Sequence, residues 1–193
     1  MIYGPALWWY SEGERSDWTE DTQCLAGRLH PPPRLLRRLI LRQEGHVPCT
    51  CSALVRRSAI ESVGGFEERF RLYEDQTLWT KLFLRYPVYV TPIRVCRYRQ
   101  HSGSISFAAT ERGNYNRMNA HPARGTFLAW LADYVSHSGM EDAGLNFMIR
   151  IARAPYVDNP TMRNRVERRL LWLIVTVGRF RRRTVRVLAR LRR

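Results

Sequence analysis

The sequence is constrained most by the turn Gly64-Gly65-Phe66 and by the acidic pair Glu74-Asp75 that follows it. The two adjacent glycines indicate the end of a helix, since glycine readily adopts the positive φ of a helix C-terminus. The acidic pair then opens a new helical pattern, which continues until a proline stops it. The dipole of a helix favours an ionised carboxylate beside its N-terminus. An ionised Asp75 on such a turn can act as a general base.

Helical and strand patterns alternate along the first half of the chain. Helices are expected where leucines recur at intervals of three or four residues, and strands where apolar and polar residues alternate. The expected elements are a strand in 1–10 that runs into an aromatic loop, a helix in 34–42, a strand in 51–56, a short helix capped by Ser58 and ended by the two glycines, a helix in 74–85, and strands in 88–91 and 94–98. This alternation predicts an α/β fold.

The second half of the chain has a different pattern, in which strands are not expected. Two helices are predicted near 126–136 and 141–152, followed by one long helix from Thr161 onward with a weak interruption at Gly178. The sequence therefore predicts three segments. These are an α/β segment in 1–106, a helical extension in 107–160 and a basic amphipathic helix in 161–193.

The net charge of +15 is concentrated in the last helix. Residues 163–193 contain 12 arginines and one acidic residue, whereas the rest of the chain contains 20 basic and 16 acidic residues. An apolar stripe recurs at helical spacing from residue 170 to the end: Leu170, Leu173, Ile174, Val177, Phe180, Leu188 and Leu191. This pattern is typical of a helix that lies on an anionic membrane surface.

Two alternatives remain open for the basic helix. It can dock on the body of the protein and present a solvated basic face. It can also bind nucleic acid, but no recognised binding motif accompanies the charge, so nucleic acid is the less favoured partner.

Composition also bears on location and on the cysteines. The longest apolar run is far shorter than the roughly 20 residues of a spanning helix, and the N-terminus lacks the pattern of a secretory signal. We therefore expect a cytoplasmic protein, peripheral at the inner face of the membrane if its basic helix binds lipid. The four cysteines, at positions 24, 49, 51 and 96, lack the spacing of a zinc site, and we expect them to be structural thiols.

A second polar stretch, from Tyr98 to Ser106, follows the last predicted strand. A neutral imidazole such as His101, with hydroxyls nearby, can complete a divalent-metal site or bind a diphosphate. Arg99 suits either a phosphate or an ion pair with the acidic pair. The alternative for His101 is a structural role at the end of the strand.

The two stretches resemble the acceptor-side signature of family 2 glycosyltransferases with a GT-A fold. In that family a Gly-Gly-Phe turn precedes a Glu-Asp pair, and a Tyr-Arg-x-His-x-x-Ser-x-Ser pattern lies about as far downstream as 98–106 does here. Segments 48–57 and 3–10 are also similar to family segments. The resemblance covers residues 1 to about 106. It implies a partial GT-A-like, Rossmann-like sheet with flanking helices, followed by an α-helical C-terminal extension.

The resemblance implies roles for individual residues. Asp75 would be the catalytic base. Acceptor contacts are implied for the residues around it: Gly64, Gly65, Phe66, Glu74 and Trp9. Contacts on the donor side are implied for His101 at the metal, and for Arg99 and Ser104 at the diphosphate. Core packing is the alternative for Trp9 and for its neighbour Trp8.

Two departures from the family pattern limit what the resemblance implies. The family often has a second acid two residues after the base, where this chain has Thr77. It also uses an Asp-x-Asp motif to hold Mg²⁺ or Mn²⁺, and this motif does not occur in the sequence. We therefore expect the acceptor-side, C-terminal portion of such an enzyme, inactive alone because the nucleotide-binding half is absent.

The expected function is that of an inverting glycosyltransferase in polysaccharide biosynthesis. It would transfer a sugar from a nucleotide-sugar donor to a hydroxyl of a carbohydrate or lipid-linked acceptor, with a divalent metal as cofactor of the complete enzyme. The alternative is a non-catalytic basic protein that has kept a degenerate glycosyltransferase fold and binds a membrane or a protein partner. Metal-dependent binding of a nucleotide sugar separates the two hypotheses.

Overall fold

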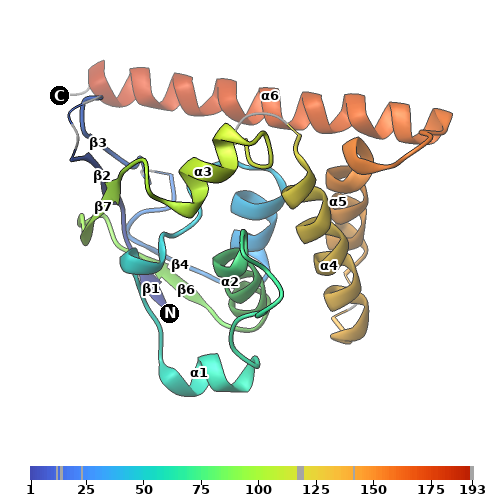
Figure 1. Ribbon diagram of the computed structural model, residues 1–193, viewed down its shortest axis with the longest axis horizontal. Helices are drawn as coiled ribbons and strands as arrows, with labels where there is room; N and C mark the ends of the chain where they lie inside the picture. The colour runs from blue at the N-terminus through green and yellow to red at the C-terminus, as the bar shows by residue number, and fades with distance from the viewer. Residues whose placement is uncertain (12, 14, 23, 117–119, 141, 192–193) are drawn as a thin grey trace.

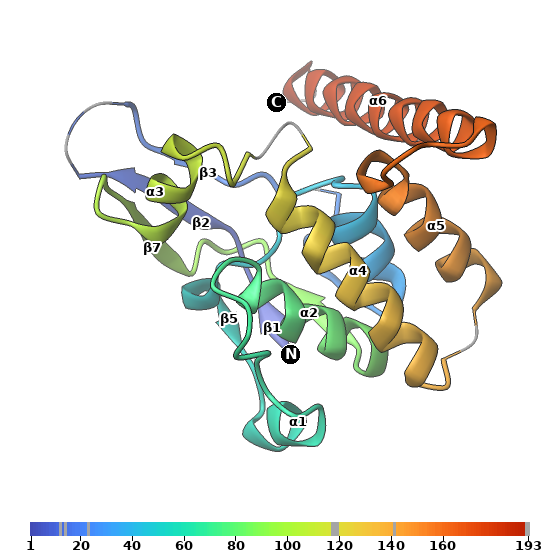
Figure 2. The same ribbon diagram turned by 45° about the vertical axis from the view of Figure 1, so that its right-hand side comes forward.

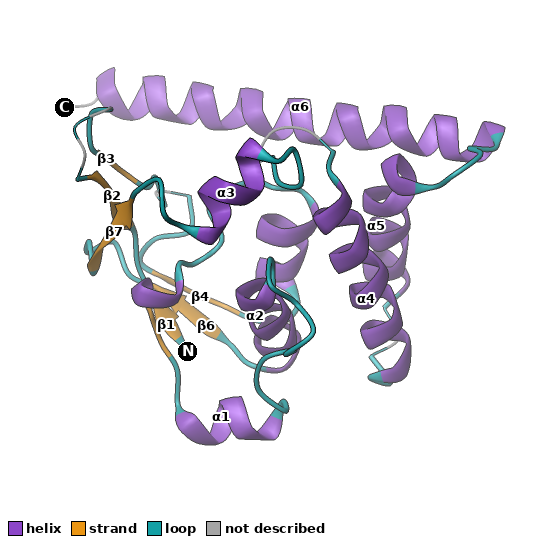
Figure 3. Cartoon of the chain, viewed as in Figure 1, coloured by secondary structure: helices purple, strands orange, loops and turns teal. Residues whose placement is uncertain are grey.

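The computed structural model describes residues 1–11, 13, 15–22, 24–116, 120–140 and 142–191, with the backbone alone from residue 179 onward. The described residues form a mixed α/β fold, with two small sheets toward one side and a group of helices toward the other (Figure 1, Figure 3). This confirms the α/β class that the alternating patterns predict.

The larger sheet has four short strands in the order β4–β6–β1–β5. Its strand β1 (Ile2–Tyr3) runs parallel to β6 (Val88–Val90) and antiparallel to β5 (Ala53–Leu54). At the other edge, β4 (Arg28–His30) runs antiparallel to β6. Buried and exposed side chains alternate along β6, so one face of this sheet packs against the core.

The smaller sheet has the order β3–β2–β7. Its central strand β2 (Ala6–Tyr10) pairs in parallel with β7 (Cys96–Gln100) and antiparallel with β3 (Trp18–Thr19). Trp8 is buried, whereas Trp9 is exposed, because successive side chains of a strand point to opposite faces.

Helical segments make up the rest of the architecture. In chain order they are η1 (Leu36–Leu41, π-helical), η2 (Thr50–Ser52, 3₁₀), α1 (Arg57–Ser62), α2 (Glu74–Arg85), α3 (Ile105–Glu111), α4 (Pro122–His137), α5 (Ala143–Arg153), η3 (Ala154–Tyr156, 3₁₀) and α6 (Met162–Leu191). α4 lies between α2 and α5, and α6 runs along one edge of the molecule (Figure 2). None of the described helices is both long enough and apolar enough to cross a membrane.

The hydrophobic core forms around α2, in which every residue from Thr77 to Leu84 is buried. Leucines of η1 pack against α2, and α4 contributes Phe127, Leu128 and Leu131 to the same core. The core therefore runs through both the predicted 1–106 segment and the predicted 107–160 segment.

Several predicted elements are confirmed. α2 has the predicted bounds, and α1 ends shortly before Gly64 and Gly65, whose φ values are 74° and 63°. The helices α4, α5 and α6 occupy the predicted helical regions, with ends that differ by a few residues.

Other predictions are wrong in detail. Segment 51–56 is not one strand, because η2 leads into the two-residue β5. The N-cap of α1 is Arg56 and not Ser58, and α6 continues through Gly178 without a break. The last predicted strand is shifted towards the C-terminus as β7. β3, β4 and α3 are not among the predicted elements. The three-residue β4 is too short for a periodic pattern and is defined by its pairing with β6, far along the chain.

Candidate functional site

α2 begins at an N-cap with an uncommon conformation. Tyr73 has a left-handed backbone with a φ of 71°, which is rare for an aromatic residue. Glu74 and Asp75 occupy the first turn, where Oδ1 of Asp75 accepts a hydrogen bond from the backbone nitrogen of Gln76 at 2.7 Å. Oγ1 of Thr77 donates to the carbonyl oxygen of Glu74 at 2.7 Å. Thr77 therefore stabilises the first turn of α2, at the position where family 2 glycosyltransferases often have an acid.

The loop before α2 is held by Lys81, the single lysine of the chain. Its Nζ donates to the carbonyl oxygen of Gly65 at 3.0 Å and lies 2.7 Å from Oε1 of Glu67. Lys81 is buried, so the contact shields its charge from bulk water. The Gly64-Gly65 turn is therefore fixed to the middle of α2.

A cavity of about 650 Å³ lies at the start of α2. Its walls come from β2, from the loop after β3, from the segment between η1 and η2, from α2 and from β7. The lining residues that bear most on chemistry are Trp8, Glu20, His46, Cys49, Asp75 and Tyr98. The fold thus brings Asp75 together with polar and aromatic side chains from much earlier and later in the sequence.

Burial raises the pKa of Asp75 to about 6, and the neighbouring charge of Glu74 contributes to the rise. The hydrogen bond from the nitrogen of Gln76 acts in the opposite direction and is too weak to cancel it. Desolvation therefore outweighs the hydrogen bonds that favour the charged form, in contrast to the low pKa that a position at a helix N-terminus alone would favour. A pKa near neutrality is well suited to a group that accepts a proton at neutral pH.

A second carboxylate, Glu20, lines the same cavity and is buried. Its Oε2 accepts a hydrogen bond from the backbone nitrogen of Ala6 at 3.1 Å, and its Oε1 accepts one from Nε1 of Trp8 at 2.9 Å. Nδ1 of His46 lies 3.9 Å from Oε1 of Glu20. The carboxylate therefore fixes the indole of Trp8 in the wall of the cavity.

Aromatic rings surround this carboxylate. Trp8 stacks on Trp18 with ring centroids 5.0 Å apart and meets Tyr98 edge-to-face, also at 5.0 Å. His46 lies 5.2 Å from Trp18, centroid to centroid. Such rigid aromatic walls present flat apolar faces, which suit the C–H face of a sugar ring as well as core packing.

Cys49 lines the cavity beside Glu20. Its Sγ lies 3.8 Å from Oε1 of Glu20. Burial raises the pKa of the Cys49 thiol, and the negative charges of Glu20 and Asp75 act in the same direction. All four cysteines of the chain are free thiols, and Sγ of Cys51 lies 3.5 Å from Sγ of Cys96.

The structure separates most of the predicted acceptor residues from the cavity. Of that set, only Glu74 accompanies Asp75 among the described lining residues. Trp9 is exposed on the opposite face of β2 from Trp8, and Phe66 is exposed beside the glycine turn. Trp8 is therefore the tryptophan that lines the cavity.

The predicted donor-side residues cluster around the end of β7 but do not line the cavity. Nε of Arg99 donates to Oγ of Ser11 at 3.0 Å. Ser104 caps α3, where its side chain accepts a hydrogen bond from the nitrogen of Phe107. His101 follows β7 and is partly buried, and its carbonyl oxygen accepts from the nitrogen of Ser104 at 3.2 Å.

Within the described ranges, histidine, cysteine and acidic side chains form no group of three or more that could hold a metal ion. The role of His101 at a metal stays a prediction.

Sequence reasoning missed several residues of the cavity. Glu20 belongs to a polar, acidic stretch of the sequence, 11–21, and its burial depends on an indole donor twelve positions away. His46 and Arg124 carried no local signal, although Arg124 is buried and donates to the carbonyl oxygen of Ile40 at 2.9 Å. A buried glutamate can be anticipated from sequence only when its hydrogen-bond donors are known.

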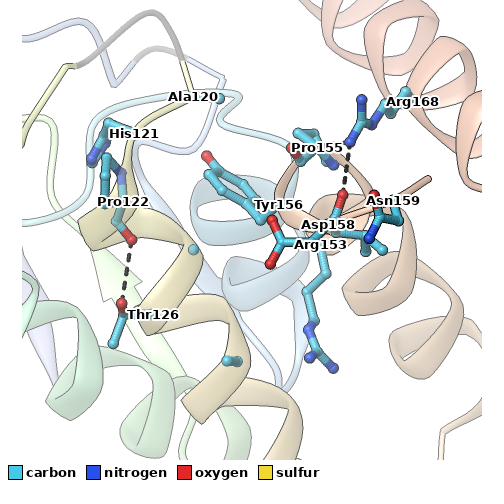
Figure 4. A pocket seen from close by; sticks show the side chains of 13 residues that line it. Ala120, His121, Pro122, Thr126, Arg153, Pro155, Tyr156, Asp158, Asn159 and Arg168 are labelled. Carbon is cyan, nitrogen blue, oxygen red and sulfur yellow. Dashed lines mark hydrogen bonds between the residues drawn. The ribbon is translucent and has the colours of Figure 1, made fainter.

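A second pocket, of about 680 Å³, lies between the start of α4, η3 and α6 (Figure 4). His121, Tyr156 and Arg168 are among the side chains that line it. The guanidinium of Arg168 donates to the carbonyl oxygens of Ala154 at 2.8 Å and Val157 at 3.2 Å. Arg168 therefore anchors α6 to η3. We place the candidate site at the first cavity, because Asp75 lines it.

Comparison with protein-family models, with curated proteins and with solved structures finds no match for this chain.

Proposed function

We propose that this chain is the acceptor-side portion of an inverting glycosyltransferase similar to family 2, with Asp75 as its catalytic base. The observation that carries the proposal is the position of Asp75, at the start of α2 in the wall of a cavity large enough for a sugar. The raised pKa of Asp75 supports the same role, because a base with a pKa near the working pH is both available and strong enough to take a proton.

The proposed step is a single displacement at the anomeric carbon of a nucleotide sugar. The acceptor hydroxyl oxygen forms a bond to that carbon while the bond to the diphosphate oxygen breaks. The proton of the hydroxyl passes to Asp75, and the nucleoside diphosphate leaves with the electron pair of the broken bond. The product is a glycoside of inverted configuration, and Asp75 then returns its proton to water.

The remaining lining residues have supporting roles in this proposal. Trp8 and Tyr98 provide aromatic faces against which an acceptor sugar can pack. Glu20 holds the Trp8 indole in place through a charge-assisted hydrogen bond. Glu74 keeps the pKa of Asp75 raised by like-charge repulsion.

The proposal is tested by titration calorimetry with a panel of mono- and oligosaccharides, and with uridine diphosphate plus Mn²⁺. We expect saccharide binding that is weakened by Tyr98→Ala and kept in Asp75→Asn. Because the chain lacks the nucleotide-binding half, glycosyl transfer from a labelled nucleotide sugar is measured with that half supplied from a family 2 enzyme, and there Asp75→Asn should lower the rate by at least about 100-fold. The matched control is Asp133→Asn, which changes an exposed aspartate on α4.

A folded chain that binds no saccharide would contradict the proposal. The second candidate is a non-catalytic, basic partner-binding protein on a degenerate form of the same fold. The observation that favours it is the concentration of 12 arginines in residues 163–193. In that case Tyr98→Ala changes no binding property of the cavity, because the cavity binds no saccharide.

A further inference from the structure

Over residues 162–178, where its side chains are described, α6 contacts the body of the protein through one side of the helix. It runs along an edge of the molecule and contacts α5 and η3 (Figure 1). Glu167 faces inward and is buried, where its Oε1 lies 2.8 Å from Nε of Arg150 on α5. Ile174 packs against the core. These contacts fix the rotation of the helix about its own axis.

The opposite side of α6 carries an exposed apolar stripe. Its residues are spaced four, seven and four positions apart, which places them on one face of a helix. Their exposed fractions are high: Met162 75%, Val166 59%, Leu173 51% and Val177 48%. Trp172, next to the stripe, is 68% exposed. We call these five residues the outer face of α6.

The outer face differs from the stripe that the sequence predicts. Leu173 and Val177 belong to both, but Ile174 packs inward, so the predicted stripe is divided between two sides of the helix. Of the other members of the predicted stripe, Leu170 is partly buried, and Phe180, Leu188 and Leu191 lie outside the described side chains. The structure thus adds residues near the start of α6 that the sequence pattern did not select.

Positive charge flanks the outer face. Arg163, Arg165 and Arg169 are exposed on the same stretch of helix. Glu167 is the one acidic residue of 163–193, and it is buried in contact with Arg150 and Arg163. Glu167 therefore does little to reduce the positive charge around the outer face.

We propose that the outer face of α6 binds an anionic lipid bilayer, with the helix lying in the plane of the head groups. The exposed leucine, valines and tryptophan enter the boundary between head groups and acyl chains, while the arginines contact lipid phosphates. Tryptophan favours this boundary, because its ring is apolar and its N–H is polar. The proposal does not depend on glycosyl transfer, since the outer face and Asp75 lie on different helices.

Other partners fit the outer face less well. A second copy of α6 would bring two arginine-rich helices together, and like charges at a helix interface are unfavourable. Nucleic acid would satisfy the arginines, but it offers no apolar layer for Trp172 and Leu173. An anionic bilayer satisfies both the charge and the apolar side chains.

The test is sedimentation of the full chain with lipid vesicles. Vesicles of phosphatidylcholine with about a third phosphatidylglycerol should bind it at least ten times more strongly than vesicles of phosphatidylcholine alone. Trp172→Ser with Leu173→Ser should weaken binding to the anionic vesicles by at least about tenfold. The matched control is Leu54→Ser with Ile93→Ser, which removes equally exposed apolar side chains elsewhere and should leave binding within about twofold.

A second variant tests the same proposal in case Trp172→Ser with Leu173→Ser fails to fold. Arg165→Gln with Arg169→Gln leaves the apolar residues in place and should weaken anionic-vesicle binding, by roughly fivefold for each arginine. The proposal is overturned if the Trp172 and Leu173 variant binds like the unmodified chain. It is equally overturned if the chain binds a short oligonucleotide but no vesicle, or if light scattering shows a dimer that the same variant abolishes.

Discussion

The hydroxyl of Tyr73 lies 3.1 Å from Nε2 of His121, across 48 positions of the sequence. Nδ1 of His121 lies 3.1 Å from the carbonyl oxygen of Asn114. Because a carbonyl oxygen only accepts, Nδ1 carries the proton and Nε2 accepts from the tyrosine. Tyr73 is the N-cap of α2 and His121 is the N-cap of α4. This bond therefore ties the helix that carries Asp75 to the helical segment of the chain.

Tyr73→Phe tests this link. The ring still stacks on Phe127, whose centroid lies 5.0 Å away, but the buried nitrogen of His121 loses its donor. We expect the free energy of unfolding to fall by about 1–2 kcal/mol, the usual cost of an unsatisfied buried group. Urea denaturation measures it, with Tyr89→Phe, at a more exposed tyrosine, as the control. Equal stability of the two variants would show that the bond contributes nothing.

Asp75 should make stability depend on pH. Its pKa is about 6 in the folded protein against 3.8 for the ordinary side chain, so the folded state binds the proton more tightly. The stability that protonation provides is present below about pH 4 and is lost as the pH rises through 6. The loss amounts to about 3 kcal/mol at most.

Asp75→Asn removes this effect. We expect the variant to be more stable than the unmodified chain at pH 8 and of similar stability at pH 4, as measured by urea unfolding across that range. Asp133→Asn, at an exposed position, should change neither value. If Asp75→Asn changed the free energy of unfolding by the same amount at every pH, burial of the carboxylate would not be the cause of the pH dependence.

α2 could be predicted from the sequence to the residue, whereas the cavity around it could not. Local signals define the helix: an acidic first turn, leucines at helical spacing and a proline soon after its end. Asp75 could be selected because it belongs to this local pattern. Glu20 and Trp8 could not, because their roles follow from a hydrogen bond between the loop after β3 and β2.

The same distinction explains the placement of Trp9 and the errors in the short strands. Which of two adjacent tryptophans faces the cavity depends on the register of β2 with β7, and a shift of one residue reverses it. β4 forms because Leu29 lies opposite Tyr89 in β6, sixty residues later. Neither relationship leaves a periodic pattern in the sequence.

Lys81→Met should destabilise the protein and loosen the loop before α2. The substitution leaves the Glu67 carboxylate and the Gly65 carbonyl without their shared partner. Glu67 is partly exposed, so water compensates in part, and we expect a loss of about 2 kcal/mol. Hydrogen exchange should show faster exchange of the amides in 64–73, with those of α5 unchanged.

A double-mutant cycle isolates this ion pair. Glu67→Gln alone should cost less than Lys81→Met, since the lysine keeps its bond to the Gly65 carbonyl. The double variant should be more stable than the sum of the two losses implies, because the unpaired carboxylate is gone. Strict additivity would show that Lys81 acts only through Gly65.

Glu20→Ala should destabilise the protein and disturb the wall of the cavity that Glu20 lines. It removes the acceptor for the nitrogen of Ala6 and for Nε1 of Trp8, both of which are buried. Two unsatisfied donors and the space left by the side chain should cost about 2–4 kcal/mol. Glu20→Gln should cost less, because its amide oxygen still accepts one of the two bonds while its amide nitrogen faces the other donor. Thermal unfolding ranks the variants, and a Gln variant as unstable as the Ala variant would show that the charge, and not the geometry, of Glu20 holds Trp8 in the wall.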